Sequence, residues 1–585
     1  MRKKTGSSAG MSKGGTVSPA EKEETPKSPT RRKFLGQVGV AAIAAGAITT
    51  APRGALGEAR SGAVGTMIPE GVLNKRMTAA HNLRVRAAKE DFKAGPAVNI
   101  TNGDLTRYAD KVGIYTKGLP HDQFGRVDPS AYATFQTALS TGKASDFKKI
   151  VMGGTRTLNG PEAGLAFDLE AADNIQFGQP EVPPAPTLAG DVTGTEMLEH
   201  YWGSLLRDIP FSEYSSNELA GQAADEFSGM QSYLGPRTAS GQVTTDLLFR
   251  GTFPGETLGP YLSQFFVKPT VMGAQSINQQ LITYLPGIDY VTSFADWVTV
   301  QNGNVTGAKN QVDPQARYAR CGRDLAAFTH VDVLYQTYFT AYLVLSSINV
   351  PVNPGNPYVG SKTENGFGTF GGPDFAATLA EASCRALNAV WYQKWFVHLR
   401  PRPEALGGPV HLVMTGQGAN TDIQPSPVLL NSVGLQQSFN KYGTWLLSQA
   451  FPEGSPTHPS YPTGHGTVGG ACLTVLKFFF DGDFVIPDPV VPSTDGLSLQ
   501  PYTGSDAGQL TVNGELNKLG HNVSFGHGTH AGIHWRSDTD TSLLLGEACA
   551  LSFLNEKAKT YNEPFSVTLQ KFDGTTATIT NTGNP

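Results

Sequence analysis

Apolar residues recur at the spacing of an α-helix through much of the chain, whereas the strict alternation typical of a half-buried strand is confined to short stretches. In the first half, helices are predicted at residues 74–94, 129–150 and 194–207. The first of these is rich in Ala, Arg and Lys, contains no proline and is expected to end before Gly95-Pro96. A long apolar pattern follows at 317–349. The pattern therefore predicts a mainly α-helical protein.

The second half contains three further helical stretches. One is predicted to have Asp374 as its N-cap and to run to about Leu399, because the prolines that begin at Pro401 stop it. A second begins just after Thr467, and a third covers 516–557 with a break in its His- and Gly-rich middle. Polar residues at the ends of these helices therefore meet loops.

A Gly-, Pro- and Asn-rich loop from Val350 to Gly372 is predicted to separate two helical lobes. A chain of 585 residues is several times the usual size of a single domain, so two or more lobes and a large buried core are expected. We place the amino-terminal lobe at 61–350, as scaffold and rim, and the carboxyl-terminal lobe, which carries the chemistry, at 351–585.

Only short β-structure is expected. Residues 484–515 are rich in Pro, Gly, Asp and Ser, which predicts irregular chain with short strands. At the carboxyl end, residues 565–569 and 575–580 alternate around Asp573-Gly574, a strong signal for a β-hairpin. The expected fold class is therefore mainly α, with long loops and a few short β-hairpins.

The amino terminus is expected to be a processing segment within residues 1–60. Arg31-Arg32 precedes a weakly apolar run at 38–48 that is too short to span a bilayer, so we expect no membrane span in the mature chain. The pattern resembles a bacterial twin-arginine export signal and predicts a periplasmic or secreted protein, with cleavage between Ala51 and Ala63. The alternative is a basic tail beside an Ala/Gly linker.

Charge and cysteine content exclude several classes of partner. The formal net charge is -5, and no Lys/Arg-rich block follows the first 35 residues, so nucleic acid is not an expected partner. The four cysteines, Cys321, Cys384, Cys472 and Cys549, form no Cys-x-x-Cys pair, which argues against a thiolate zinc site. We interpret them as buried thiols, although an exported protein leaves room for one disulfide.

Histidines concentrate in the carboxyl-terminal part. Eight of the twelve fall between His398 and His534, which favours one polar site there. Three groups of residues occur in this region: Lys394 with Arg402, the run Pro462-Thr463-Gly464-His465, and His534 with Asp538. Gly464 leaves an amide open to a ligand. The ammonium of Lys394 and the planar guanidinium of Arg402 suit an oxyanion. Asp538, four residues after His534, can fix the tautomer of its imidazole.

Each group also has a plain structural interpretation. A basic helix end that holds Lys394 and Arg402 can simply complement the helix dipole. The run that ends at His465 can be a Pro-Gly turn before a core helix, and His534 with Asp538 can be a surface pair on one helix. Only the three together, in this order, favour a single site.

Taken together, the groups resemble the three-part signature of the type 2 phosphatidic acid phosphatase superfamily, which includes vanadium-dependent haloperoxidases and bacterial acid phosphatases. The resemblance is strongest to the bromoperoxidases of red algae and their bacterial relatives, over residues 373–550. The stretches that carry it are Trp391-Tyr392-Gln393-Lys394-Trp395-Phe396-Val397-His398, Arg402-Pro403-Glu404-Ala405, Gly514-Glu515-Leu516-Asn517-Lys518-Leu519 and Leu543-Leu544-Leu545-Gly546-Glu547.

The resemblance implies two helical-bundle halves with the site at the mouth of the carboxyl-terminal one. It also implies a vanadate cofactor bound through His534 as the metal ligand. The residues that match the remaining cofactor contacts are Lys394, Arg402, Thr463 and the amide of Gly464. His465 matches the acid/base histidine, and His458 matches a second active-site histidine.

The activity implied is the oxidation of halide, bromide above all, by hydrogen peroxide to hypohalous acid, which halogenates small organic acceptors. Relatives in this family are oligomeric, so a homo-oligomer is expected. Two alternatives remain open from the sequence. One is an acid phosphatase in which His534 is the nucleophile and His465 protonates the leaving alcohol, and the other is a non-catalytic oxyanion-binding relative.

The sequence departs from the family pattern at two places. Thr463 stands where the family has serine, which keeps the hydroxyl and restricts its rotamer. The family also has an arginine six residues before the ligand histidine, where this chain has Gly528. One inserted residue would align His527 with that arginine, and we then expect vanadate to bind more tightly as the pH falls toward the pKa of His527. Arg536 follows His534 by two residues and so lies on nearly the opposite face of the helix, where it cannot easily take the place of this arginine.

Overall fold

The computed structural model describes residues 68–94, 98–169, 173 and 182–582. Residues 70–585 form one compact unit, and the predicted export segment lies outside the described residues. The fold class is confirmed as mainly α-helical, with short antiparallel hairpins. None of the described helices combines the length and the hydropathy that crossing a bilayer requires.

The longer helices carry most of the fold. They are α2 Glu70–Ala94, α4 Pro129–Thr141, α6 Asp191–Leu205, α7 Glu218–Ser228, α9 Phe294–Gln301, α10 Gly322–Val331, α11 Gln336–Ser347, α12 Gly372–Tyr392, α13 Pro403–Met414, α15 Val433–Tyr442, α16 Gly464–Phe479, α17 Val512–His521 and α19 Arg536–Ala558. Short α-helical turns are α3 Asp104–Arg107, α5 Ala144–Phe147, α8 Gln264–Val267, α14 Pro427–Leu430 and α18 His527–Ala531.

Two π-helical turns and several 3₁₀ turns connect these elements. The π-turns are η5 Gln393–His398, which continues α12, and η8 Asn522–Gly526, which joins α17 to α18. The 3₁₀ turns are η2 Pro161–Leu165, η3 Phe211–Ser216, η4 Thr245–Leu247, η6 Gly418–Asn420 and η7 Ala507–Gln509. A π-turn holds one residue more than an α-turn, so both π-turns change which side chains face the core.

The strands form three two-stranded antiparallel hairpins. They are β1 Thr270–Met272 with β2 Gln275–Ile277, β3 Val490–Pro492 with β4 Leu499–Pro501, and β5 Phe565–Gln570 with β6 Thr576–Asn581. The last hairpin turns at Gly574, whose φ of 82° favours glycine, as the Asp-Gly signal predicted. The expected short strands within 484–515 are β3 and β4.

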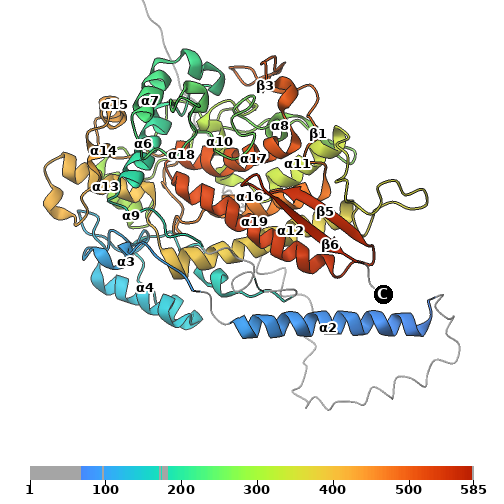
Figure 1. Cartoon of the computed structure of the whole chain (residues 1–585). Coiled ribbons are helices and arrows are strands. Elements are labelled where there is room, and N and C mark those ends of the chain that lie inside the picture. Colours follow the sequence, from blue (N-terminus) through green and yellow to red (C-terminus); the bar gives the residue numbers. More distant parts are fainter. Residues whose placement is uncertain (1–67, 95–97, 170–172, 174–181, 583–585) are drawn as a thin grey trace, which may run out of the picture. The chain divides into compact units, whose positions relative to one another are not determined.

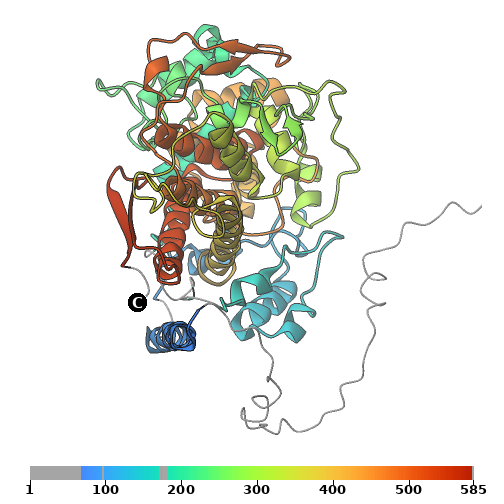
Figure 2. The same cartoon turned by 90° about the vertical axis from the view of Figure 1, so that its right-hand side faces the viewer.

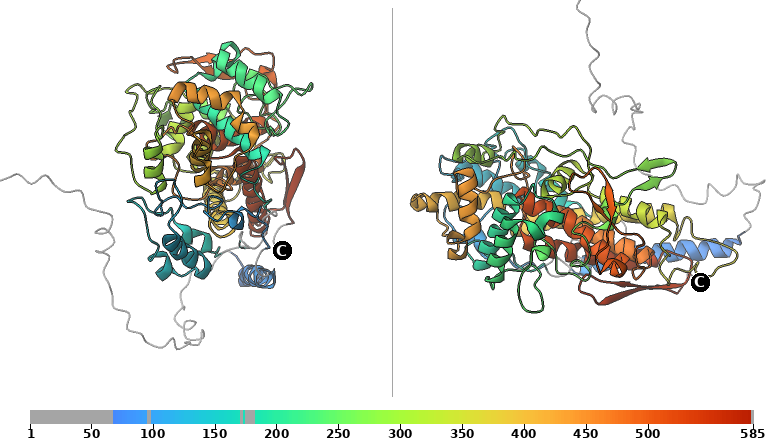
Figure 3. Two further views of the ribbon diagram at one scale, coloured as in Figure 1. Left: turned by 90° about the vertical axis from the view of Figure 1, so that its left-hand side faces the viewer. Right: turned by 90° about the horizontal axis from the view of Figure 1, so that it is seen from above.

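The helix α16 forms the centre of the core. It packs against α12 and α19, and the β5–β6 hairpin lies against α16 and α19 (Figures 1 and 2). Every residue of α16 except His465 is buried, which explains why its sequence is apolar all round. Helices α14 and α15 pack on α6 (Figure 3). One hydrophobic cluster runs from Tyr108 to Ile579 and so includes residues on both sides of the 350–372 loop.

Glycines allow α16 and α19 to approach until their backbones touch. A Cβ at Gly470 would lie 2.1 Å from the carbonyl oxygen of Leu543, and a Cβ at Gly546 would lie 2.0 Å from that of Thr467. No side chain fits at either position without moving one helix. The spacing of these two helices, and therefore the position of the first turn of α16, depends on Gly470 and Gly546.

Several sequence expectations need correction. The stretch 129–150 breaks after α4 because Gly142 adopts a left-handed conformation, and 317–349 divides into α10 and α11. Asp374 is not the N-cap of α12: Gly371 is, and the Asp374 carboxylate accepts from the Phe370 amide instead. Cys384 is exposed, whereas the other three thiols are buried, and all four are free.

His521 forms a buried charged cluster at the end of α17. Its Nδ1 lies 2.7 Å from Glu256 Oε1, and its Nε2 forms an ion pair at 3.2 Å with Asp540. Burial alone would lower the pKa of His521, but Glu256 and Asp540 outweigh it and raise the pKa to about 9. The imidazolium therefore stabilises the fold below the pKa of unfolded histidine, and this contribution is lost as the pH rises through 9.

We expect His521 to make the thermal stability fall between pH 6.5 and 9.5. A rise from 6.5 to about 9 corresponds to about 3 kcal/mol of stability that disappears over this range. The measurement is the melting temperature by scanning calorimetry at several pH values. His521→Gln should lower the melting temperature at pH 6.5 and flatten its fall with pH, and an equally steep fall in that variant would contradict the assignment.

Candidate active site

The groups singled out in the sequence meet at the amino-terminal end of α16. Lys394 Nζ donates to the carbonyl oxygens of Pro459, at 2.7 Å, and Ser460, at 2.8 Å. It reaches them because it lies on the π-turn η5, which ends at Leu399 with a left-handed φ of 44°. The prediction that this helix ends near Leu399 is confirmed. Lys394 therefore ties the end of this helix to the loop before α16.

Arg402 links the second group to the third. Its Nε donates to the His458 carbonyl at 3.0 Å, and one terminal nitrogen donates to the Ile533 carbonyl at 2.9 Å and to His534 Nε2 at 2.8 Å. The other terminal nitrogen lies 3.0 Å from His458 Nδ1. Arg402 thus contacts both histidines that the sequence proposed at the two ends of the site.

Lys394 and Arg402 are both fully buried cations. Burial lowers the pKa of Lys394 well below its usual value, with the charge of Arg402 adding to the effect, and burial also lowers the pKa of Arg402 to about 10. The charge of Asp538 opposes the fall in pKa for both groups. Two buried cations that share one carboxylate favour a bound anion.

The Asp538 carboxylate fixes the tautomer of His534. It accepts from His534 Nδ1 at 3.0 Å, from the Trp535 amide at 3.1 Å, from Arg400 at 2.8 Å and from the Ser460 hydroxyl. Because a carboxylate can only accept, Nδ1 carries the proton and Nε2 keeps its lone pair, to which Arg402 donates. Burial lowers the pKa of His534 well below 6.5, so the ring is neutral.

The pairing of His534 with Asp538 agrees with the sequence prediction, but its place in the fold differs. The two residues do not share a helix, because α19 begins at Arg536 with Trp535 as its N-cap. Asp538 lies in the first turn of α19, whereas His534 precedes that turn. The carboxylate thus accepts from the N-cap amide and the imidazole together.

Thr463, Gly464 and His465 begin α16 instead of preceding it. Thr463 is the N-cap, yet its side chain makes no capping hydrogen bond, and its buried Oγ1 has no partner among the described residues. A Cβ at Gly464 would lie 3.0 Å from the Trp391 ring, so glycine suits the close approach of that ring. An unused hydroxyl and the free amides of a helix amino terminus are donors suited to an oxyanion.

His465 pairs with Asp332, a residue that the sequence did not indicate. His465 Nε2 lies 3.0 and 3.2 Å from the two oxygens of Asp332, which follows α10. The carboxylate accepts the Nε2 proton, which leaves Nδ1 as the basic nitrogen. Nothing at a recognisable spacing marks Asp332, because it lies 133 residues before its partner.

His458 lies between Arg402 and Trp391. Its ring centroid is 4.9 Å from that of Trp391, at an interplanar angle of 35°. Burial first, and then the charge of Arg402, lowers the pKa of His458 well below 6.5. As a neutral ring, His458 can accept from the guanidinium of Arg402 and help to orient it.

His527, which one inserted residue would align with the family's arginine, lies beside two other histidines of the site. Its ring centroid lies 4.8 Å from that of His465 and 6.4 Å from that of His534. The π-turn η8 immediately precedes it and accommodates one extra residue. A Cβ at Gly528 would lie 2.9 Å from His534 Cβ, so position 528 cannot hold a long side chain. Arg536 is committed to Glu199, with Nε–Oε2 at 3.0 Å.

The expected pH effect of His527 changes accordingly. Burial, and then His465 nearby, lowers the pKa of His527 well below 6.5. A charged His527 therefore requires more acid than the unperturbed value of histidine suggests. If the positive charge of His527 strengthens anion binding, it does so at a lower pH than the sequence alone predicted.

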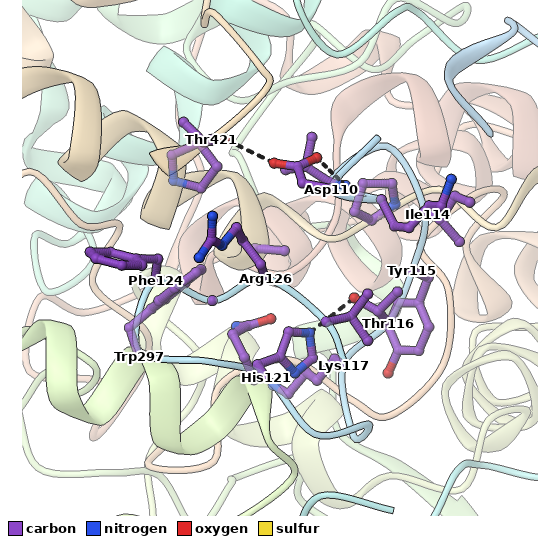
Figure 4. A pocket seen from close by; sticks show the side chains of 18 of the residues that line it. Asp110, Ile114, Tyr115, Thr116, Lys117, His121, Phe124, Arg126, Trp297 and Thr421 are labelled. Carbon is purple, nitrogen blue, oxygen red and sulfur yellow. Dashed lines mark hydrogen bonds between the residues drawn. The ribbon is translucent and has the colours of Figure 1, made fainter. Parts of the chain in front are cut away.

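A second cluster that the sequence missed fixes the loop before His458. Lys117 Nζ donates to Glu404 at 2.8 Å and to the carbonyl of Ser455 at 2.7 Å, and burial lowers its pKa to about 8. Lys117, Ser455 and Arg402 line one cavity, in which Figure 4 labels Lys117. In that cavity Thr116 Oγ1 and His121 Nε2 lie 3.0 Å apart. Lys117 thereby connects α13 to the chain that carries His458.

The donor set fits a tetrahedral oxyanion better than a metal cation. Within the described part of the chain, no group of three or more His, Cys, Asp or Glu side chains could hold a metal ion. Instead, the site combines the buried hydrogen-bond donors of Lys394, Arg402 and Thr463 with one lone pair, that of His534 Nε2. Vanadate, a covalently coordinating oxyanion, is a group that such a set suits.

Comparison with known proteins finds relatives that are all vanadium-dependent bromoperoxidases. No family model matches the chain. It is 34% identical over 525 residues to a vanadium-dependent bromoperoxidase of Ascophyllum nodosum, covering 86% of this chain and 92% of that protein. It is 33% identical to the vanadium-dependent bromoperoxidase of Corallina officinalis, covering 88% of this chain and 100% of that protein.

A solved structure gives the same result. The homohexameric structure of the second vanadate-dependent bromoperoxidase of Ascophyllum nodosum superimposes with a TM-score of 0.82 and 27% identity. The alignment covers 95% of this chain and 99% of that one. The similarity therefore includes the amino-terminal half as well as the segments that surround α16.

We expect phosphate or vanadate to raise the melting temperature through Lys394. An anion at 100 times its dissociation constant stabilises the fold by about 2.7 kcal/mol. Lys394→Met leaves the carbonyl oxygens of Pro459 and Ser460 without this donor, so each variant is compared with itself in the presence and absence of anion, and Lys394→Met should lose most of the rise. The control is Lys477→Met. Lys477 is buried like Lys394, but it lies in the last turn of α16 and donates to Asn517 at 2.8 Å, so its loss should leave the anion response unchanged. A full anion response in Lys394→Met would contradict the assignment.

Proposed function

The chain belongs to the vanadium-dependent bromoperoxidases, and we propose that the site around His534 binds its vanadate and serves its peroxidase reaction. The protein is an enzyme that uses vanadate and hydrogen peroxide to oxidise halide. The observation that carries the site assignment is the lone pair on His534 Nε2, fixed by Asp538 and lying beside the buried cation Arg402.

Five residues would hold the cofactor. His534 Nε2 supplies the ligand nitrogen, while Lys394 and Arg402 neutralise the oxyanion and the Thr463 hydroxyl and Gly464 amide donate to its oxygens. When bound, vanadate supplies a Lewis-acidic centre that activates hydrogen peroxide for attack by halide. Arg402, which donates to His534 Nε2 in this structure, has the same donor available for an oxygen of the anion.

His465 is proposed to accept and return the proton in the reaction. Asp332 holds the Nε2 proton of His465, so Nδ1 can accept a proton from hydrogen peroxide and return it to the departing oxygen. Asp332 also stabilises the imidazolium that forms in between. The net reaction consumes hydrogen peroxide, halide and one proton and yields hypohalous acid and water.

His458 is proposed to position Arg402. It accepts from Arg402 through its carbonyl oxygen, at 3.0 Å, and through ring Nε2, at 3.2 Å, because its Nδ1 faces the carbonyl oxygen of Pro459. Lys117 and Glu404 fix the chain on either side of this contact. Hypohalous acid that leaves the site halogenates small organic acceptors in solution, so no acceptor pocket is needed for this step.

Export and assembly are further parts of the proposal. The Arg31-Arg32 segment supports transport by the bacterial twin-arginine route, which carries proteins already folded. The homohexameric relative supports a homo-oligomer. Expressed in a bacterium that has this route, the mature chain should be found in the periplasm or medium, with a mass by light scattering that is a multiple of the protomer mass. Cytoplasmic retention would contradict export, and a monomeric mass would contradict assembly.

The activity is tested by bromination of a phenol-type dye with hydrogen peroxide, bromide and added vanadate. We expect turnover that depends on all three, and no turnover or vanadate uptake in His534→Ala. Asp332→Asn should keep vanadate affinity within a few-fold and lower kcat by about 10²–10⁴, because it affects only the proton carrier. Hydrolysis of an aryl phosphate without bromination would favour a phosphatase instead.

A further inference from the structure

We propose that His527 presents its Nε2 to the bound oxyanion as a hydrogen-bond acceptor, so that the site selects oxyanions that carry a proton. This inference rests on the proposed function, because it assigns a role to one more residue of the same site. With one inserted residue in the alignment, His527 matches the position at which the family has an arginine, which can only donate. The change at this position therefore reverses the direction of a hydrogen bond as well as removing a charge.

The backbone of η8 determines which ring nitrogen of His527 carries the proton. His527 Nδ1 forms a hydrogen bond with the Val523 carbonyl oxygen, four residues earlier. A carbonyl oxygen can only accept, so Nδ1 is the protonated nitrogen and Nε2 of the neutral ring has a lone pair. No donor or acceptor in the described part of the chain reaches that Nε2.

The neighbours of His527 place its ring beside the oxyanion site. The ring lies 4.8 Å from that of His465 and 6.4 Å from that of His534, centroid to centroid. Its side chain is buried, and Arg402 is close enough to influence it. Burial, His465 and Arg402 all oppose a positive charge on the ring, which agrees with the neutral form.

A neutral acceptor discriminates between oxyanions of equal charge. A proton-bearing oxyanion can donate its hydroxyl to Nε2, whereas an oxyanion without a proton faces this lone pair with one of its own. Leaving such a buried pair unmatched weakens binding by about ten- to a hundredfold. His465 Nδ1 is a second acceptor of this kind, so His527 strengthens a preference that His465 already provides.

The surrounding chain explains how His527 reaches this place. The extra residue of η8 turns His527 toward His465, while Gly528 passes against His534 with no room for a Cβ. The preceding residue of the same turn, Gly526, has Leu325 and the Tyr261 hydroxyl within 3.2 Å of its ideal Cβ position. Of these three consecutive positions, 527 is therefore the one at which a large side chain is accommodated beside the site.

The test compares two pairs of tetrahedral dianions at pH 8 by isothermal titration calorimetry of the vanadate-free protein. Hydrogen phosphate and hydrogen arsenate carry a proton, whereas sulfate and molybdate have the same charge and carry none. We expect the wild type to prefer the proton-bearing pair. His527→Phe, which keeps a ring without an acceptor, should reduce this preference by about tenfold or more. His527→Gln, which keeps an acceptor oxygen, should retain most of it.

The outcomes separate this inference from the proposed function. The role of His527 is overturned if the wild type shows no preference or the reverse preference. It is also overturned if His527→Phe keeps the full preference, even if vanadate binds. Failure of the wild type to bind vanadate, measured by vanadium-51 NMR in parallel, overturns the proposed function itself. His527→Arg provides a further check: it should bind sulfate and molybdate more tightly and lose the preference, and retention of the preference would count against the inference.

Discussion

The carboxylate of Asp538 is the group on which the whole site depends. It is fully buried and accepts hydrogen bonds from the Ser460 hydroxyl, His534, the Trp535 amide and Arg400. These donors come from three separate parts of the chain, and the Asp538 carbonyl also accepts from the Thr463 amide. A buried carboxylate is stable only when it is saturated in this way, so the loop, the end of η5 and α19 must all be in place together. Folding and assembly of the site are therefore one event.

Much of the site could be predicted from the sequence because its residues lie in short local patterns. Lys394 and Arg402 flank one helix end, Thr463 to His465 begin a helix, and His534 with Asp538 are four residues apart. The helical periodicity also located α6, α12 and α19 closely, since each buries apolar residues over many turns. The helix α2 was located by its composition, because Ala87 is its only buried residue. Where local patterns failed, as at Gly142 and Asp374, a single backbone conformation or a competing local hydrogen bond overrode the propensity.

Other parts depend on contacts that no local pattern records. Asp332 meets His465 across 133 residues, and Lys117 meets Glu404 across 287. The π-turns η5 and η8 were equally hidden, because the same sequence fits a regular helix until neighbouring elements require otherwise. Both π-turns adjoin the site, one carrying Lys394 and the other preceding His527. Small departures from regular helix geometry thus orient two side chains that the sequence could only propose.

The glycine contacts between α16 and α19 limit how this protein can change over evolutionary time. Gly470 and Gly546 touch no site residue, yet a methyl group at either would push the two helices apart. The same displacement would move Thr463 and His465 on α16 away from Asp538, whose carbonyl accepts from the Thr463 amide at the same end of the pair. Mutational tolerance along these helices is consequently governed by interaxial spacing as well as by chemistry. Diversification of the site is easiest where the backbone can accommodate an extra residue, as a π-helical turn such as η8 does.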